Sequence, residues 1–232
     1  MTTNATSVAD NIARIQQQLQ QAATTAKRNP HSVRLIAVSK TKPTALIEQA
    51  YQAGQRDFGE NYVQEGVDKV QQLAELTDIC WHFIGPLQSN KTKDVAAHFD
   101  WVQSIDRLKI ARRLSDQRSP ELPPLQVLIQ VNIDDETTKS GVSEAELMPL
   151  AEAIDALPNL ELRGLMAIPA PAANSGQPTS FAAMHGLFLK LQAQYKQVDT
   201  LSMGMSDDMV AAIEHGSTMV RIGTAIFGAR SA

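Results

Sequence analysis

Residues 33–40 read VRLIAVSK, a short apolar run with β-branched residues that ends on a lysine. Such a run predicts a buried strand with Lys40 directly after it. Further short runs of this kind alternate with amphipathic helical segments along the chain. We expect strands near residues 33–38, 56–58, 80–84, 100–104, 125–132, 160–167, 199–202 and 218–221. This alternation is typical of βα units around a parallel sheet.

The order of these elements predicts the class of the fold. Helices are expected near residues 43–53, 60–75, 89–98, 106–118, 143–156, 179–197 and 206–215. Eight strands alternating with helices in 232 residues favour an α/β fold of the (β/α)8 TIM-barrel type. A doubly wound sheet more often has a glycine fingerprint after its first strand, where this chain has a lysine. We expect residues 1–232 to form a single barrel domain with an extra N-terminal helix, which begins at a capping pair of Ser7 and Asp10.

Composition and charge exclude several classes of function. The formal net charge is −4 and the pI is near 5.7, so no general basic surface is available for nucleic acid or anionic lipid. The single cysteine, Cys80, cannot form an intrachain disulfide. Neither a secretory signal nor a run long enough for a membrane span is recognisable. We therefore expect a cytoplasmic protein with no nucleic-acid and no membrane partner.

Two later segments resemble the end of the first run, because in each an apolar stretch ends in small polar residues or glycine. They are LSMGMS at residues 201–206 and VRIGT at residues 220–224. Each leads into an expected helix start, where free backbone N–H groups and the helix dipole favour a phosphate. In TIM barrels a phosphate is often held by the loops after strands seven and eight, and closure places strand eight beside strand one. Lys40 and both segments are therefore expected to share one rim.

Lys40 is the candidate nucleophile of this rim. It alternates with Ile36 and Val38, so its side chain is expected to point into the barrel, although an exposed strand-end lysine is the alternative. Burial and nearby positive charge would lower the pKa of an inward lysine and favour the neutral amine. An amine beside a phosphate site fits a phosphorylated aldehyde held as a Schiff base.

Arg221 has two interpretations. It either forms a structural ion pair or faces the ring of a cofactor. An arginine stays charged and does not readily pass a proton to a pyridine nitrogen, so the ring would then remain a weak electron sink. His82 is expected to be a core histidine with its hydrogen bonds satisfied, and Tyr62 to pack at a helix start. We expect no metal site.

The order and spacing of seven motifs resemble the pyridoxal phosphate homeostasis protein family, and the resemblance covers nearly the whole chain. The motifs are VSKTKP (38–43), FGENYVQE (58–65), HFIG (82–85), LQSNK (87–91), GLM (164–166), SMGMS (202–206) and RIGTAIFG (221–228).

This resemblance implies a fold similar to the barrel domain of alanine racemase, with pyridoxal 5'-phosphate (PLP) held on Lys40. The residues that it places against the cofactor are Lys40, Asn61, Ser206, Arg221, Gly223 and Thr224. It puts Arg221 near the pyridine nitrogen, and Gly223 and Thr224 at the phosphate. It also implies a binding role without robust catalysis, in which the protein supplies or buffers vitamin B6.

Three functions remain open from the sequence. The first is a PLP carrier, whose partners would be B6 vitamers and PLP-dependent apoenzymes. The second is a small PLP-dependent amino-acid racemase, which would need an acid/base group on each face of the cofactor. A racemase-like β-domain is not expected, because the sequence ends at Ala232. The third is an aldolase-like barrel acting on a sugar phosphate through Lys40. Lys139 is either a solvated loop lysine or a rim cation for a second vitamer, and a monomer is expected.

Overall fold

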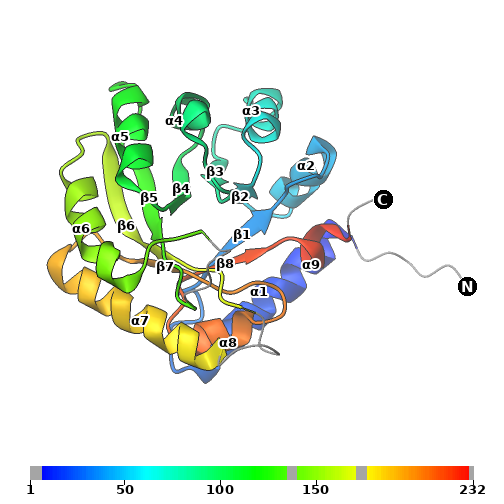
Figure 1. The fold of residues 1–232 in the computed structure, drawn as a ribbon. Coiled ribbons are helices and arrows are strands. Elements are labelled where there is room, and N and C mark those ends of the chain that lie inside the picture. Colours follow the sequence, from blue (N-terminus) through cyan, green and yellow to red (C-terminus); the bar gives the residue numbers. More distant parts are fainter. Residues whose placement is uncertain (1–6, 135–139, 171–176, 230–232) are drawn as a thin grey trace, which may run out of the picture.

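The computed structural model describes residues 7–134, 140–170 and 177–229. At its centre eight parallel strands form a closed barrel in the order β1 to β8, and β8 pairs with β1 (Figure 1). The strands are β1 (Arg34–Val38), β2 (Asp57–Glu60), β3 (Cys80–Phe83), β4 (Trp101–Ile105), β5 (Leu125–Gln130), β6 (Leu160–Met166), β7 (Thr200–Ser202) and β8 (Met219–Ile222). The predicted barrel is confirmed.

The two faces of β1 show how the barrel is filled. Leu35 and Ala37 belong to the large core between the strands and the surrounding helices. Ile36 lies between them in sequence and therefore points the other way. It joins a second, smaller cluster that fills the inside of the barrel, and the other members of that cluster are Trp101, Leu128, Met166 and Met219. Ile36 lies opposite Arg221 in the β1–β8 register, so closure brings the first and last strands together.

One α-helix follows each strand, and these helices surround the barrel (Figure 1). They are α2 (Thr44–Gln52), α3 (Val63–Gln72), α4 (Thr92–His98), α5 (Leu108–Gln117), α6 (Glu144–Asp155), α7 (Gln177–Gln194), α8 (Met209–Glu214) and α9 (Thr224–Phe227), with a 3₁₀ turn η1 (Ser89–Lys91) before α4. Among the described residues, no helix has the length and apolar character needed to cross a membrane.

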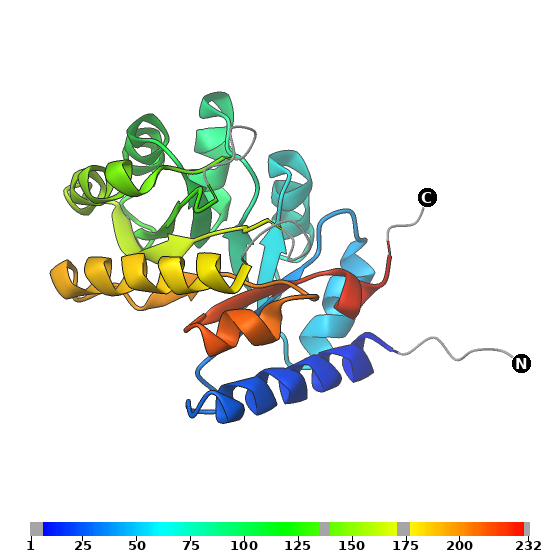
Figure 2. The same ribbon diagram turned by 60° about the horizontal axis from the view of Figure 1, so that its bottom comes forward.

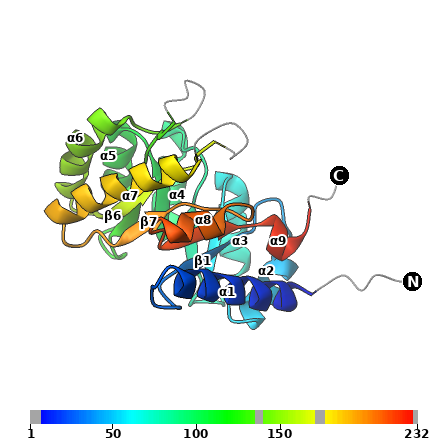
Figure 3. The same ribbon diagram turned by 90° about the horizontal axis from the view of Figure 1, so that it is seen from below.

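The extra N-terminal helix, α1 (Val8–Thr25), is also confirmed. Ser7 and Asp10 form the predicted capping box, in which each side chain accepts from the backbone N–H of the other residue. The apolar face of α1 is buried, and the helix packs against α2, α8 and α9 (Figures 2 and 3). The amide of Asn11 donates to the carbonyl oxygen of Ile226 at 3.0 Å, which ties α1 to the last helix.

Several predicted boundaries were wrong by a few residues, and three of them lie near the rim of the barrel or change the type of element. The helix expected from residue 206 begins at Met209, because residues 206–208 form a turn in which the Asp208 carboxylate accepts the N–H of Met205 at 2.6 Å. The strand expected to reach residue 132 ends at Gln130, and only an isolated bridge follows it. The helix expected over residues 89–98 opens with the 3₁₀ turn instead.

Candidate functional site

A cavity of about 530 Å³ opens where strands β1, β2, β3, β6, β7 and β8 end, and its volume is typical of small-molecule sites. Its lining residues are Val38, Lys40, Asn61, Ile84, Ile168, Met205, Ser206, Asp207, Arg221, Gly223, Thr224 and Ala225. All six residues predicted to contact a cofactor are in this set. Barrel closure brings Lys40 and the segments after β7 and β8 to one cavity, as the chain order suggested, and Asn61 joins them there.

Lys40 lies in a tightly held turn just beyond β1. The next residue, Thr41, has a φ of 62°, in the left-handed region that non-glycine residues adopt only under constraint. Its N–H donates to the carboxylate of Glu65 at 2.5 Å. On the other side, the hydroxyl of Ser39 donates to Glu60 at 2.6 Å. Both neighbours of Lys40 are thus fixed, so the backbone that carries the amine is fixed too.

The clamp around Lys40 is built on a buried ion pair. Lys69 donates to Glu60 at 2.8 Å, to Glu65 at 2.6 Å and to the carbonyl oxygen of Ser39 at 2.7 Å. Glu60 has no exposed side-chain surface, and that of Lys69 is 6% exposed. Burial raises the pKa of the Glu60 carboxyl, and Lys69 opposes this rise. The positive charge of Lys69 therefore offsets the free-energy cost of burying the Glu60 carboxylate beneath the site.

Asn61 follows β2 and presents an unused polar atom. Its Oδ1 is buried, and no described residue gives it a hydrogen bond. A buried polar group without a partner costs about 1–3 kcal/mol, so this atom marks a place where a ligand group would be favourable. Gly85 lets the chain after β3 lie close to the backbone of Asn61, because a Cβ at Gly85 would lie 2.2 Å from the carbonyl oxygen of Asn61.

Arg221 is buried at the cavity, and two hydrogen bonds fix its guanidinium on the side away from the cavity. Its Nη1 donates to the hydroxyl of Ser202 at 2.6 Å, and its Nη2 donates to the carbonyl oxygen of Ala167 at 2.9 Å. Burial lowers the pKa of the guanidinium to about 10, so it remains charged at neutral pH. Among the described residues Arg221 forms no ion pair, so the structure does not support the ion-pair interpretation.

Neutral donors gather at the ends of β7 and β8. Ser206 is half-buried in the turn after β7, and Gly223 and Thr224 open α9 after β8. The N–H groups of a first helical turn have no acceptor within the helix. A Cβ at Gly223 would come within 3.2 Å of the carbonyl oxygen of Val38, which is tighter than most contacts allow. Asp207 also lines the cavity, but its side chain is exposed.

The remaining candidates from the sequence lie elsewhere. His82 is fully buried and hydrogen-bonded through both ring nitrogens, to Gln103 and Asp57, so the prediction of a satisfied core histidine is confirmed. Tyr62 does not pack as predicted: it is 52% exposed beside an adjoining cavity. Lys139 lies outside the described residues.

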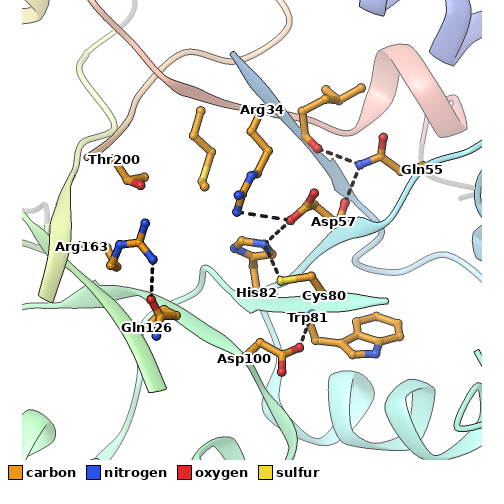
Figure 4. A network of polar contacts seen from close by, with 12 residues as sticks. Arg34, Gln55, Asp57, Cys80, Trp81, His82, Asp100, Gln126, Arg163 and Thr200 are labelled. Atoms are coloured by element: carbon orange, nitrogen blue, oxygen red, sulfur yellow. Dashed lines mark hydrogen bonds and ion pairs between the residues drawn. The ribbon is translucent and has the colours of Figure 1, made fainter. Parts of the chain in front are cut away.

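Asp57, Cys80 and His82 have their ligand atoms within 4.8 Å of one another at the amino-terminal end of the barrel (Figure 4). Their chemistry does not favour a metal ion. His82 shares its Nε2 with Asp57 at 3.0 Å, and burial raises the pKa of the Cys80 thiol. The guanidinium of Arg34 also lies 3.7 Å from the Asp57 carboxylate. We do not assign a metal to this cluster.

The residues that support the site were not predicted from the sequence. They are Glu60 and Lys69 next to Lys40, and Gln103 and Ser202 inside the barrel. A signal was present for two of them. Glu60 ends a strand inside the FGENYVQE motif, and Gln103 interrupts the apolar run of β4 at an inward position. Polar groups at such positions must find partners inside the fold.

Comparison with known proteins identifies the family. Residues 10–231 match the family described as alanine racemase, N-terminal domain. The chain is 58% identical over 226 residues to the pyridoxal phosphate homeostasis protein of Escherichia coli K12, covering 96% of this chain and 97% of that one. It is 60% identical over 228 residues to the protein of the same name from Vibrio alginolyticus, covering 97% and 98%.

A solved structure of PipY from Synechococcus elongatus PCC7942 with PLP bound superposes with a TM-score of 0.82 at 37% identity, covering 95% of this chain and all of PipY. The chain described here belongs to the pyridoxal phosphate homeostasis protein family, built on the alanine racemase N-terminal barrel.

Proposed function

We propose that this protein binds PLP, holds it covalently on Lys40 and buffers or supplies it in vitamin B6 homeostasis. The observation that carries the proposal is the meeting of one clamped lysine, one buried arginine and a set of neutral donors on the wall of a single cavity. The likeness to PipY, which was solved with PLP bound, supports the same assignment.

The residues present fit this cofactor. PLP supplies a reactive aldehyde, a pyridine ring and a phosphate. Lys40 offers an amine for the aldehyde, and the buried Oδ1 of Asn61 marks a polar position that a ligand would satisfy. Ser206, Gly223 and Thr224 offer hydroxyl and backbone donors for the phosphate. Arg221 would face the pyridine nitrogen as a hydrogen-bond donor that keeps its own proton.

One feature favours a carrier over the racemase alternative. Racemisation needs an acid/base group on each face of the ring. Among the described residues that line the cavity, the titratable side chains are Lys40, Asp207 and Arg221, and Asp207 is exposed to solvent.

An absorption spectrum and an intact mass test the proposal directly. The purified protein loaded with PLP is expected to be yellow, and borohydride is expected to add the mass of one pyridoxyl phosphate to the chain. Peptide mapping should place that mass on Lys40. A protein that stays colourless in excess PLP and gains no mass would contradict the proposal and favour the aldolase-like alternative.

Turnover separates carrier from racemase. We expect the PLP-loaded protein to exchange the α-proton of L-alanine in D2O far more slowly than the roughly 1–1,000 per second at which enzymes usually turn over. Proton NMR of the alanine measures this exchange. Sustained exchange within that range, absent from a Lys40→Ala control, would replace the carrier assignment with a racemase.

The wider setting follows from the same proposal. B6 vitamers are the expected small-molecule partners, and PLP-dependent apoenzymes are the expected recipients. We further propose a monomer that acts in the cytoplasm as a single barrel domain.

A further inference from the structure

A continuous line of hydrogen bonds crosses the inside of the barrel beneath the cavity. Arg221 on β8 donates to Ser202 on β7 at 2.6 Å, and Ser202 donates to Gln103 on β4 at 2.6 Å. Gln103 contacts His82 on β3 at 3.1 Å, and His82 contacts Asp57 on β2 at 3.0 Å. Ser202, Gln103 and His82 have no exposed surface, so water does not compete for these bonds.

The carboxylate of Asp57 fixes the direction of every bond in this line. A carboxylate accepts only, so His82 must donate through Nε2. Burial lowers the pKa of His82, and the neutral ring then has an acceptor at Nδ1. The amide of Gln103 must therefore donate to that nitrogen and turn its oxygen to Ser202. Ser202 must in turn donate to this oxygen, which leaves its lone pairs for the N–H of Arg221.

Contacts at Gln103 and at Asp57 support the same donor and acceptor assignment. The Nε2 of Gln103 also donates to the sulfur of Met219 at 3.2 Å, which a reversed amide would turn into a contact between two acceptors. At the far end, Figure 4 shows Arg34 and His82 both pointing at Asp57, and these two groups hold the pKa of Asp57 below its usual value although burial would raise it. The line therefore begins on a fixed negative charge and ends on a fixed positive one.

We infer that Ser202, Gln103 and His82 are positioning residues for Arg221, and that they fix the guanidinium in the orientation in which it meets the ring of the cofactor. The inference rests on the proposed function, because it assigns these residues a task toward PLP. Nη1 and Nη2 are both anchored from behind, by Ser202 and by Ala167, so the plane of the guanidinium is set before a ligand arrives. Donors that are already fixed in the binding geometry lose less conformational entropy when a ligand binds.

The direction of the line is tested without PLP. Long-range ¹H–¹⁵N spectra of the full ¹⁵N-labelled chain, with the His82 signals assigned from a His82→Gln variant, report which ring nitrogen carries the proton. We expect a neutral His82 protonated at Nε2 at neutral pH. A proton on Nδ1, or a doubly protonated ring, would overturn the inference whether or not the protein binds PLP.

The coupling to Arg221 is tested by PLP titration of variants. Gln103→Leu is expected to raise the dissociation constant for PLP about tenfold, the size of one lost buried hydrogen bond. Gln55→Leu is the matched control, since Gln55 is also a buried glutamine with two hydrogen bonds, to the carbonyl oxygens of Leu35 and Asp57. It meets Asp57 only at the main chain and donates to no side chain of the line, so Gln55→Leu is expected to change the constant less than about twofold.

A double-mutant cycle shows whether Gln103 acts through Arg221. In an Arg221→Lys background, Gln103→Leu is expected to change PLP affinity less than about twofold. Should Gln103→Leu fail to fold, Ser202→Ala removes the link next to Arg221 with a small change in volume and should show the same tenfold loss. The inference fails if these variants bind PLP as well as Gln55→Leu does, or if their effects persist in full without Arg221. Failure of the wild type to bind PLP would instead contradict the proposed function.

Discussion

Replacing Lys40 by alanine is expected to abolish the covalent adduct with PLP. Lys40 is the lysine on the wall of the cavity among the described residues, and a primary amine is needed to form the imine that borohydride fixes. After borohydride treatment, the intact mass of the PLP-treated variant should equal that of the untreated chain. Lys40→Arg should behave in the same way, because the guanidinium keeps a positive charge but is not a nucleophile at neutral pH.

The neighbouring lysine provides the control. Lys42 is two residues further along, and its ammonium donates to the carbonyl oxygen of Ala229 at 2.6 Å. Lys42→Ala should keep the full adduct. If Lys40→Ala still gained the mass of pyridoxyl phosphate, peptide mapping would reveal the lysine that carries it. The assignment of Lys40 would then be wrong, even if the protein still bound PLP.

Replacing Lys69 by methionine is expected to cause the largest loss of stability. It removes the positive partner of Glu60, a carboxylate with no exposed surface. The remaining hydrogen bond that this carboxylate accepts from a described side chain comes from the hydroxyl of Ser39. Breaking a buried pair in this way costs about 3–5 kcal/mol in the free energy of unfolding. For a chain of this size, Tm should fall by on the order of 10 °C, as measured by calorimetry or circular dichroism.

A second ion pair serves as the matched control for Lys69. Lys190 and Glu144 form an exposed pair at 3.0 Å, with side chains 66% and 67% accessible. Lys190→Met should therefore cost less than about 1 kcal/mol. Adding Glu60→Gln to the Lys69→Met variant should restore part of the lost stability, because it removes the stranded charge. A Lys69→Met variant no less stable than Lys190→Met would show that the buried pair does not hold the clamp.

The Lys69→Met loss should also depend on pH in a defined direction. Burial already raises the pKa of Glu60, and without Lys69 the pKa should rise further. A carboxyl whose pKa is raised in the folded state binds more protons when folded than when unfolded. Its contribution to stability is then present at low pH and is lost as pH rises through the folded pKa. The stability difference between wild type and variant should therefore be larger at pH 8 than at pH 5.

Most of the fold could be predicted from the sequence because its signals are local. Residues 33–38 show a buried strand, Ser7 and Asp10 mark a helix start, and the alternation of both kinds of segment predicts a barrel. Six candidate site residues also followed from the sequence, because barrel closure brings the ends of the first and last strands together, and because their motifs resemble a known family. Whether those six bind PLP stays a prediction.

The supporting residues could not be predicted in the same way. Glu60 and Lys69 lie nine residues apart in sequence, but their pairing depends on how deeply α3 packs against β2. Gln103 lies 99 residues from Ser202 and meets it only because β4 and β7 face each other across the closed barrel. The sequence alone determined the elements, their order and the rim on which Lys40 and Arg221 meet, since periodicity and chain order carry that information. Tertiary structure alone decided which buried polar groups pair beneath that rim, because hydrogen bonds depend on distances of about 3 Å that no one-dimensional pattern specifies.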